Sequence, residues 1–440
     1  HHSPIHHSPI HHSPIHHSPI HHSPIHHSPI HHSPIHHSPI YHSPIHHSPN
    51  HHSPIHHSPI HQSTMRIMLF AIPVFFLLIG LELLVARLRH TKLYSLPDAV
   101  TNLSCGIQQQ VTGVLFKTIL FAGYVWAYDH RFWTIPEAWW SFVLVFIGVD
   151  FFYYWFHRST HEISVLWGTH IVHHQSEEYN LSVALRQSAI QAFASNFFYL
   201  PLAFLGFSPT SFLVMAIFQT LYQFWIHTRT IDKLHPAFEY IFNTPSHHRV
   251  HHGVNPKYLD RNHGGTLIIF DRWFGTFQTE EEEPVYGVTV PLASWNPVWA
   301  QVDYYAWLGQ RLAQASSWAD RFRMLFRKPG WLPASLGGSV EAKPVTAQTF
   351  HKFETRVPPR IATYVLVQFA ILLIVTFLFL KTAGDTPGMT TQNLALTGWI
   401  VWTTGSLGGL LEGRKWAWWS ELGRWAVVVL AIVAFIWGGF

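Results

Sequence analysis

Histidine is the residue type in this chain whose spacing points to chemistry. Three short clusters stand at residues 157–161 (HRSTH), 170–174 (HIVHH) and 247–252 (HHRVHH), and FWIH ends on a further histidine at position 227. Side chains three and four residues apart share a face of a helix, and imidazole is a common ligand of Fe, Zn, Cu and Ni ions. The pattern therefore predicts a metal site, and the number of histidines favours two ions. The candidate ligands are His157, His161, His170, His173, His174, His227, His248, His251 and His252.

An aspartate precedes the first cluster on the same predicted helical stripe. Asp150, Tyr154, His157 and His161 are spaced 0, 4, 7 and 11, so they lie along one face. A carboxylate in an apolar helix is costly and marks a candidate functional site. We predict that Asp150 accepts the free ring N–H of a ligand histidine and fixes its tautomer; the alternative is an aspartate that faces water. Three glutamates are candidates for the same role or for balancing metal charge: Glu162, Glu177 and Glu178.

A low-complexity segment opens the chain. Residues 1–60 are copies of HHSPI with two single-residue changes, and HQSTM at 61–65 is a decayed further copy. Proline at every fifth position disfavours a helix, and the segment is too polar to form a core. Residues 1–64 are therefore predicted to be disordered. We interpret them as a DNA repeat translated from an upstream start site, so that the protein proper begins at Met65 or Met68; loose metal binding is the alternative.

The remaining composition excludes several classes of protein. All 27 basic and 23 acidic residues lie after the repeat, and this small positive balance does not favour nucleic-acid binding. The single cysteine, Cys105, excludes an intramolecular disulfide and a cysteine-based zinc site. Long apolar and aromatic runs dominate instead, which indicates a membrane protein.

Eight apolar runs come close to the length of a membrane crossing, which takes about 20 helical residues. The runs are 68–85, 103–126, 139–156, 189–206, 211–226, 361–380, 394–411 and 425–440. The predicted fold is all-α: a polytopic integral membrane protein with a cytosolic, histidine-rich helical cap. The predicted organisation is the repeat (1–64), N-terminal spans (65–138), a catalytic domain (139–285), a cytosolic connecting region (286–360) and C-terminal spans (361–440).

The distribution of lysine and arginine predicts the orientation. Positive residues concentrate in cytoplasmic loops, which places Arg87, Arg89 and Lys92 in the cytoplasm. Counting crossings from that loop puts every histidine cluster on the cytoplasmic side, at or just beyond the membrane boundary. We expect a multi-pass protein of a bacterial inner membrane with the site facing the cytoplasm.

Several motifs together resemble a known superfamily. They are HRSTHE, HIVHHQSEEYNLSVALRQS, FWIHT, NTPSHHRVHHGVNPKYLDRNHGG and LIIFDRWFGTF. Over residues 150–277 the chain resembles the fatty acid hydroxylase/sterol desaturase superfamily of membrane di-iron oxygenases, and most closely its branch that acts on alkylglycerol ether lipids. The resemblance implies a helical membrane protein with a cytosolic cap over two Fe ions, which Zn could replace. It also implies O₂-dependent hydroxylation or desaturation of a membrane lipid, with a reduced pterin as electron source in the ether-lipid branch.

Carried over position by position, the resemblance makes the nine candidate histidines the metal ligands. The chain departs from the family pattern at Gln223, where many members have a histidine, so one metal lacks a ligand there or takes an amide oxygen or water. The doubled histidine leaves His247 or His248 as the first ligand of its cluster, and the spacing favours His248. His235 and His263 stand where the family does not demand histidine, and we predict both to be peripheral.

The chain carries no dinucleotide fingerprint, CxxCH haem site or ferredoxin-type cysteine set. Electrons must therefore come from a separate protein or a small reductant. Two other classes fit the histidines less well. A metal transporter or storage protein would place ligands near the middle of the membrane. A structural zinc site is closed and four-coordinate, which is too small for nine imidazoles.

Overall fold

The computed structural model describes residues 59–339, 345–346, 348–383 and 387–438, with side chains from residue 70 to residue 437. Every regular element of this described part is a helix, and the only β pairing within it consists of two isolated bridges. The all-α prediction is confirmed. Residues 1–58 of the repeat lie outside the described residues, and the first helix begins at Pro59, inside the stretch predicted to be disordered.

Six helices of the described part are long and apolar enough to cross a membrane, so the chain is a multi-pass membrane protein. Each of them overlaps one of the predicted runs. They are α1 (Pro59–Leu88), α2 (Leu96–Asp129), α3 (Trp139–Glu162), α13 (Pro359–Ala383), α14 (Thr391–Leu411) and α15 (Lys415–Gly438).

The other two predicted crossings form a shorter helical hairpin. Helix α6 (Gln191–Leu205) has 15 residues and α7 (Pro209–Trp225) has 17. At about 1.5 Å per residue they reach roughly 22 and 25 Å, less than the ~30 Å hydrocarbon core. The turn closes tightly because Gly206 has φ +101° and any Cβ there would lie 2.1 Å from the carbonyl oxygen of Trp133. The sequence thus predicts eight full crossings, whereas the described residues form six helices of crossing length and one shorter hairpin.

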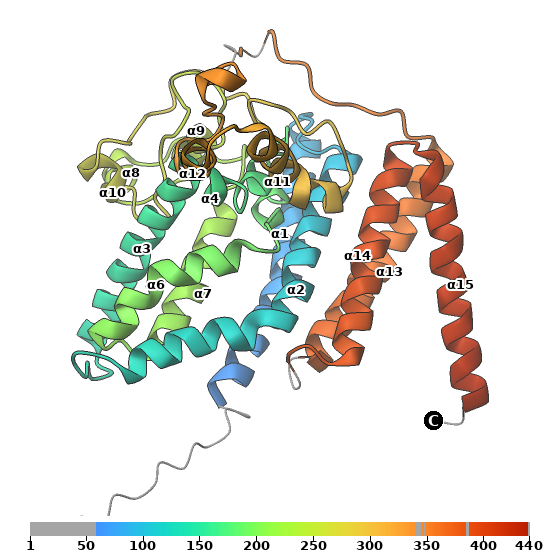
Figure 1. The fold of residues 1–440 in the computed structure, drawn as a ribbon, viewed down its shortest axis with the longest axis horizontal. Helices are drawn as coiled ribbons and strands as arrows, with labels where there is room; N and C mark the ends of the chain where they lie inside the picture. The colour runs from blue at the N-terminus through green and yellow to red at the C-terminus, as the bar shows by residue number, and fades with distance from the viewer. Residues whose placement is uncertain (1–58, 340–344, 347, 384–386, 439–440) are drawn as a thin grey trace, which may run out of the picture. The chain divides into compact units, whose positions relative to one another are not determined.

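The membrane helices present their histidine-bearing ends to one side, beneath a cap formed by residues 163–190 and 227–339 (Figure 1). At that side Arg89, just beyond α1, donates a hydrogen bond to the carbonyl of Thr230, just beyond α7, over 2.9 Å. At the opposite end the Phe132 N–H donates to the Phe204 carbonyl over 2.7 Å. Successive helices therefore run in alternating directions, and the three histidine clusters and His227 all gather at one end.

The cap consists of short helices and loops. Its helices are α4 (Ser164–Trp167), α5 (Ile171–His174), α8 (Pro236–Ile241), α9 (Pro245–His251), α10 (Ile269–Trp273), α11 (Pro297–Gln314) and α12 (Trp318–Phe326). Helix α11 packs on α2 and α14 and so ties the cap to the membrane helices. Its first turn is fixed by Asn296, whose side chain accepts hydrogen bonds from the N–H groups of Val298 and Trp299.

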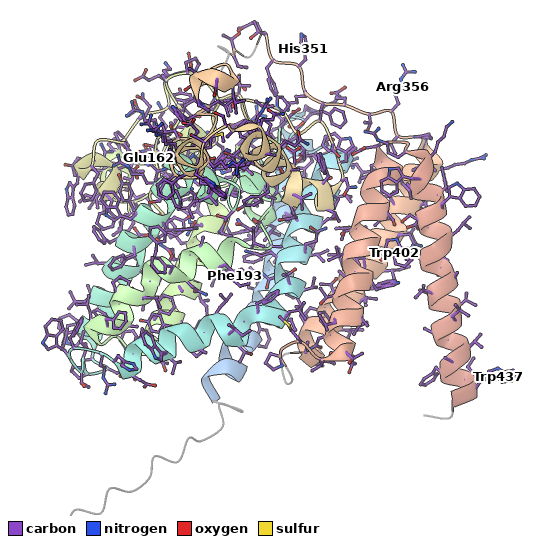
Figure 2. The ribbon with its side chains drawn as sticks, viewed as in Figure 1. Glu162, Phe193, His351, Arg356, Trp402 and Trp437 are labelled. Atoms are coloured by element: carbon purple, nitrogen blue, oxygen red, sulfur yellow. The ribbon has the colours of Figure 1, made fainter. Side chains whose placement is uncertain are left out.

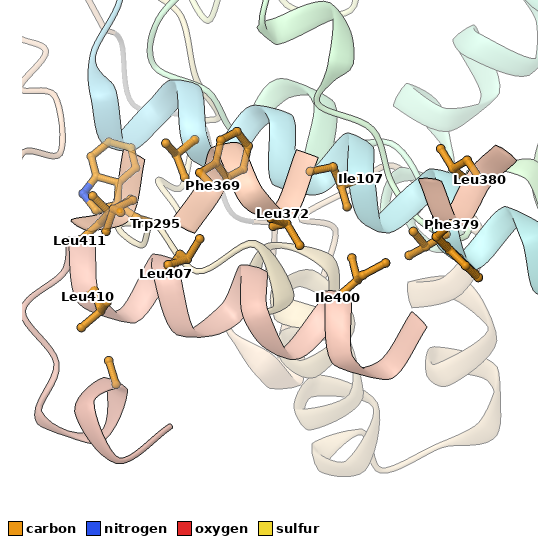
Figure 3. Packing of buried hydrophobic residues seen from close by; sticks show 14 of the residues in the cluster. Ile107, Trp295, Phe369, Leu372, Phe379, Leu380, Ile400, Leu407, Leu410 and Leu411 are labelled. Carbon is orange, nitrogen blue, oxygen red and sulfur yellow. The ribbon is translucent and has the colours of Figure 1, made fainter. Parts of the chain in front are cut away.

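The C-terminal helices pack against α2 through a continuous apolar core (Figure 3). Ile107 of α2, Leu372 of α13, and Ile400 and Leu407 of α14 are all at most 6% exposed. Helix α14 approaches the start of α11 so closely that a Cβ on Gly408 would lie 2.5 Å from the Trp295 carbonyl oxygen. This apolar core holds the membrane helices beneath the cap, and none of its residues is one of the candidate histidines.

The alternating helices generate a testable topology. His351 and Met389 are exposed residues at the two ends of α13, and Figure 2 labels His351 and the neighbouring Arg356 on the cap side. Because one crossing separates them, cysteines introduced by His351→Cys and Met389→Cys should react with a membrane-impermeant thiol reagent from opposite sides. Cys105 is fully buried and gives little background. Labelling of both variants from the same side would contradict the arrangement.

Candidate metal centre

The nine predicted histidines converge in the cap and divide into two groups. Within each group, one ring nitrogen from every imidazole lies within 4.8 Å of one from every other, and all nine side chains are buried. The five-histidine group is His157, His161, His170, His174 and His251. The four-histidine group is His173, His227, His248 and His252. All the candidates that clustered in sequence are thus brought together in space.

The HxxHH spacing explains this division. In the 170–174 cluster, the first and last histidines lie four residues apart and enter the five-histidine group, while His173 turns to the other group. The 248–252 cluster does the reverse: its outer pair enters the four-histidine group and His251 joins the five. Each HxxHH cluster therefore supplies both groups, because along a helix position i+4 lies about 40° from position i, whereas position i+3 lies about 60° away on the other side.

Backbone carbonyls orient four of these imidazoles. The Nδ1 atom of His157 lies 2.8 Å from the carbonyl oxygen of residue 263, and the Nδ1 atom of His173 lies 2.9 Å from the carbonyl oxygen of residue 186. The Nδ1 atom of His227 lies 2.7 Å from the carbonyl oxygen of residue 223, and the Nδ1 atom of His251 lies 2.9 Å from the carbonyl oxygen of residue 261. A carbonyl only accepts, so each of these Nδ1 atoms carries the proton and leaves the lone pair on Nε2. The lone pairs point into the two groups.

In the four-histidine group, two Nε2 atoms then meet at a distance that hydrogen bonding cannot explain. Those of His173 and His227 lie 3.2 Å apart, yet both rings already hold their proton on Nδ1. Two facing lone pairs repel each other unless a cation lies between them. The pairs His157–His170, at 2.9 Å, and His251–His174, at 3.2 Å, bring the same kind of atoms together in the other group. Both donor sets therefore suit a metal ion that accepts nitrogen ligands.

Burial keeps the cap histidines in the form that binds metals. It lowers the pKa of His173 to about 4, and burial together with the neighbouring imidazoles lowers the pKa values of His174, His248 and His252 well below the usual range. A neutral imidazole is the species that coordinates a metal. The site is thus set for coordination at neutral pH.

Asp150 does not have the predicted partner. Its carboxylate accepts hydrogen bonds from Gln219 Nε2, at 2.7 Å, and from the N–H groups of Thr266 and Leu267, at 2.7 and 2.8 Å, and from no imidazole of the described part. The predicted bond to a ligand histidine is wrong because Asp150 lies seven residues, or roughly 10 Å, below His157 along α3. Asp150 instead joins α3 to α7 and to the loop that follows the last histidine cluster.

A second buried carboxylate holds the same loop. Asp271 accepts from the N–H groups of His263 and Gly264, each at 2.7 Å. A Cβ on Gly265 would lie 2.8 Å from Asp150 Oδ1, so only glycine fits this approach. The loop matters because the carbonyl of His263 is the one that orients His157. Sequence analysis missed the role of Asp271, although its motif, FDRW, was part of the family resemblance.

Asp260 is a further residue that sequence analysis missed. Its Oδ1 lies 3.7 Å from His161 Nδ1, and its Oδ2 lies 3.3 Å from Lys328 Nζ. Burial alone would raise the pKa of this carboxyl, but His161 and Lys328 together lower it to about 2. Asp260 thus stays ionised on the outer side of His161, although 3.7 Å is too long for the hydrogen bond that was predicted for Asp150. Asp260 belongs to the DRN part of the NPKYLDRNHGG motif, which contributed to the family resemblance. Its place in that motif was the signal that could have identified it.

The remaining candidates lie outside both groups. Gln223 contributes its backbone carbonyl to His227. The ring of His247 packs against Phe277 at 5.4 Å, which agrees with His248 being the first member of its cluster. His235 is exposed at the start of α8. His263 is fully buried beside the five-histidine group, 5.1 Å between ring centroids from His161, without entering it.

The three candidate glutamates serve other contacts. Glu162 pairs with Arg158 one turn earlier, at 3.0 Å. Glu177 accepts from the backbone N–H of Phe353 at 2.6 Å, and Glu178 pairs with Lys352 at 2.6 Å. The contacts of Glu177 and Glu178 fasten the histidine-bearing loop to the segment that leads into α13. None of the three glutamates belongs to either histidine group.

Comparison with known proteins places these residues in a family. The model of the family described as fatty acid hydroxylase matches residues 142–276, which include both histidine groups. Alkylglycerol monooxygenase of Homo sapiens is 39% identical over 350 residues, covering 78% of this chain and 77% of that protein. The Danio rerio protein of the same name is 38% identical over 369 residues, covering 82% and 81%. Ornithine lipid hydroxylase OlsE of Rhizobium tropici is 29% identical over 155 residues, covering 34% and 46%. No solved structure matches the chain.

Substitution of Asp150 tests how the loop is held. In Asp150→Asn, the new amide N–H group would face one of the three N–H donors that the carboxylate now binds. Because two donors cannot bond to each other, the loop should shift, and with it the carbonyl that orients His157. We expect metal affinity to fall roughly tenfold, as for other groups that orient ligands indirectly. Competition with a chelator measures the change, and Asp303→Asn, at a half-buried carboxylate on α11, is the matched control. Unchanged affinity in Asp150→Asn would show that the loop does not need this carboxylate.

The two groups should also lose metal separately. His161→Ala removes one imidazole from the five-histidine group and His252→Ala removes one from the four-histidine group. Each variant should therefore lose about one metal ion per chain while still inserting in the membrane, as measured by elemental analysis of purified protein. His235→Ala, at an exposed histidine outside both groups, should keep the wild-type content. Full metal content in either of the first two variants would remove that histidine from the ligand set.

Proposed function

This chain belongs to the fatty acid hydroxylase family and is a membrane lipid monooxygenase, and we propose that it uses two iron ions to hydroxylate the alkyl chain of an ether lipid. One observation carries the proposal. Two groups of inward-facing imidazoles lie at the ends of membrane helices, in a chain that aligns with alkylglycerol monooxygenases over most of its length. A lipid substrate is then able to reach the groups from the bilayer rather than from water.

Each group would hold one ion, with the five-histidine group offering one more nitrogen than the four-histidine group. Iron bound there would supply the redox chemistry that activates O₂. The chain's own residues perform the remaining tasks. Backbone carbonyls keep the ligand nitrogens unprotonated, an ionised Asp260 lies on the outer side of His161, and the buried cap excludes water. The proposed catalytic machinery is thus almost entirely histidine, with Asp150 as a positioning residue.

The proposed reaction needs no further acid or base. Hydroxylation of the carbon next to the ether oxygen consumes one O₂, two electrons and two protons and releases water. The hydroxylated product is a hemiacetal, which breaks down to a fatty aldehyde and a glycerol derivative. We propose a separate electron donor, namely a reduced pterin, because the chain lacks sequence motifs for haem, flavin or iron–sulfur cofactors.

We propose that the site faces the cytoplasm of a bacterial inner membrane, and the charge distribution supports this orientation. Arg87, Arg89 and Lys92 lie at the end of α1 on the histidine side, and Arg414 and Lys415 lie between α14 and α15 on the same side. Positive residues favour the cytoplasmic face. A water-soluble reductant made in the cytoplasm would then meet the cap directly.

A second candidate is hydroxylation of an acyl lipid. It is favoured by the similarity to an ornithine lipid hydroxylase, although that match covers only 34% of this chain. The same histidine groups would serve for both substrates, because both reactions begin at a C–H bond of an apolar chain. Desaturation of a membrane lipid is a further outcome of the same chemistry.

Supplying each substrate to purified protein distinguishes these functions. With iron, a reduced pterin and an alkylglycerol, we expect a fatty aldehyde, detected by mass spectrometry, at a rate that depends on O₂. His173→Ala should make no aldehyde, since it removes a nitrogen from the four-histidine group. If an acyl lipid is hydroxylated or desaturated instead, the ether-lipid assignment is wrong and the oxygenase assignment stands. Bound zinc without O₂ consumption would overturn the oxygenase itself.

A further inference from the structure

Helices α8 and α10 expose a group of large apolar side chains on the cap. Trp273 is 67% exposed and Tyr240 58%, while Phe238, Ile241 and Phe274 are each more than a third exposed. Single apolar residues scattered over a protein surface are common, but a contiguous group marks an interaction site or a membrane contact. These five residues are called the α8–α10 surface below.

The two helices form one surface because Arg272 of α10 holds α8. Its guanidinium donates to the carbonyl oxygens of Tyr240, at 3.0 Å, and Glu239, at 3.2 Å, and lies 4.7 Å from the centre of the Tyr240 ring. The N–H of Ile268, just before α10, donates to the Ile241 carbonyl over 2.9 Å. The exposed side chains of the two helices therefore keep a fixed arrangement toward each other.

The α8–α10 surface continues the outer surface of the membrane helix α3, beside which both helices lie (Figure 1). Exposed and half-buried apolar side chains form a stripe along α3, three or four residues apart: Trp140, Leu144, Ile147, Phe151 and Trp155. The Trp155 ring meets that of Phe274 with centroids 5.0 Å apart, and Phe151 meets Phe270 of α10 edge-on at 5.5 Å. The stripe thus passes directly into the α8–α10 surface.

The length of α3 sets the depth of this junction in the membrane. Trp139 begins the helix at the end away from the histidines and is 81% exposed, as expected of a tryptophan in the aromatic belt of a membrane boundary. Trp155 lies roughly 24 Å further along the helix axis. The hydrocarbon core is about 30 Å thick. Trp155 and the Phe274 ring against it therefore lie no higher than the boundary on the cap side.

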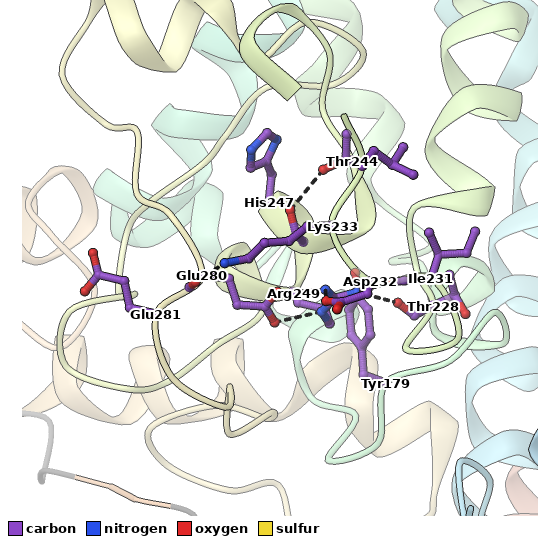
Figure 4. Close-up of polar contacts among 12 residues, drawn as sticks. Tyr179, Thr228, Ile231, Asp232, Lys233, Thr244, His247, Arg249, Glu280 and Glu281 are labelled. Carbon is purple, nitrogen blue, oxygen red and sulfur yellow. Dashed lines mark hydrogen bonds and ion pairs between the residues drawn. The ribbon is translucent and has the colours of Figure 1, made fainter. Parts of the chain in front are cut away.

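The charges around the α8–α10 surface suit a lipid boundary. Elsewhere on the cap, near residues 228–233, charged side chains bind one another, and Arg249 holds Glu280 through two hydrogen bonds of 2.7 Å (Figure 4). Beside the α8–α10 surface, Arg261 and Arg272 instead donate to backbone carbonyls, so their positive charge is not neutralised by a carboxylate. At a bilayer boundary, aromatic rings meet acyl chains and cations meet lipid phosphates.

We propose that the α8–α10 surface is embedded in the boundary layer of the membrane beside α3, with its aromatic rings among the acyl chains and the two arginines at the level of the lipid head groups. The inference goes beyond the proposed function and does not depend on it, since it concerns the partner of the cap and no step of a reaction. Helix α10 also carries Asp271, which holds the loop whose carbonyl orients His157. One short helix thus connects the lipid contact to the five-histidine group.

Spin labels on introduced cysteines measure this depth. We expect nitroxides at Trp273→Cys and Tyr240→Cys, in phospholipid nanodiscs, to be relaxed by O₂ rather than by a water-soluble nickel chelate, with a ratio several-fold higher than at Glu281→Cys. The reason is that O₂ concentrates in the hydrocarbon and the chelate stays in water. Glu281, an exposed carboxylate, gives the aqueous reference, and Ile147→Cys on α3 gives the bilayer reference. Cys105 is fully buried and contributes little background.

Two labelled positions keep the test independent of either substitution. Ratios close to the Ile147 reference support the inference, and ratios that match the Glu281 reference would show that the surface lies in water and would overturn it. Spin–spin broadening between labels would show that a second copy of the chain covers the surface, which would overturn it as well. Because no turnover is measured, failure of the protein to oxidise any lipid would contradict the proposed function and leave this inference standing.

Discussion

The structure depends on where nine imidazoles keep their protons. A histidine can face either of its two nitrogens inward, and a group of them binds a metal only if each offers a lone pair. Here the backbone makes that choice for four rings by placing a carbonyl oxygen beside Nδ1. Because a carbonyl cannot donate, the tautomer follows from the fold and needs no carboxylate beside each ligand.

The loops that carry these carbonyls must therefore be held precisely. Residues 263–267 are fastened by two buried carboxylates, Asp150 from a membrane helix and Asp271 from α10. Arg186, whose carbonyl orients His173, is itself fully buried and donates to the carbonyl of Val172 and to Gln175. Charges that never approach the histidine nitrogens thus decide where those nitrogens point. The site extends well beyond its nine rings.

Sequence was sufficient for the features that repeat along the chain. Apolar runs located the membrane helices, and the HxxHH spacing located the histidines, because both patterns are local. Long-range partners could not be predicted in the same way. Asp150 shares a stripe with His157, yet its hydrogen bonds go to the loop more than a hundred residues away, while Asp260 has the outer position beside His161. Helical spacing describes a face and cannot show which loop will fold against it.

Each HxxHH cluster supplies histidines to both groups. The number of residues between its histidines is therefore as important as the identity of the histidines themselves. One residue added within residues 170–174 would rotate the rest of the box by about 100° and send His173 and His174 away from their present neighbours. Either HxxHH cluster carries ligands for both groups, so a change in the length of one cluster disturbs both groups at once. Over evolutionary time such a segment is free to change its side chains between the histidines but closed to insertions and deletions. The two centres are inherited as one unit.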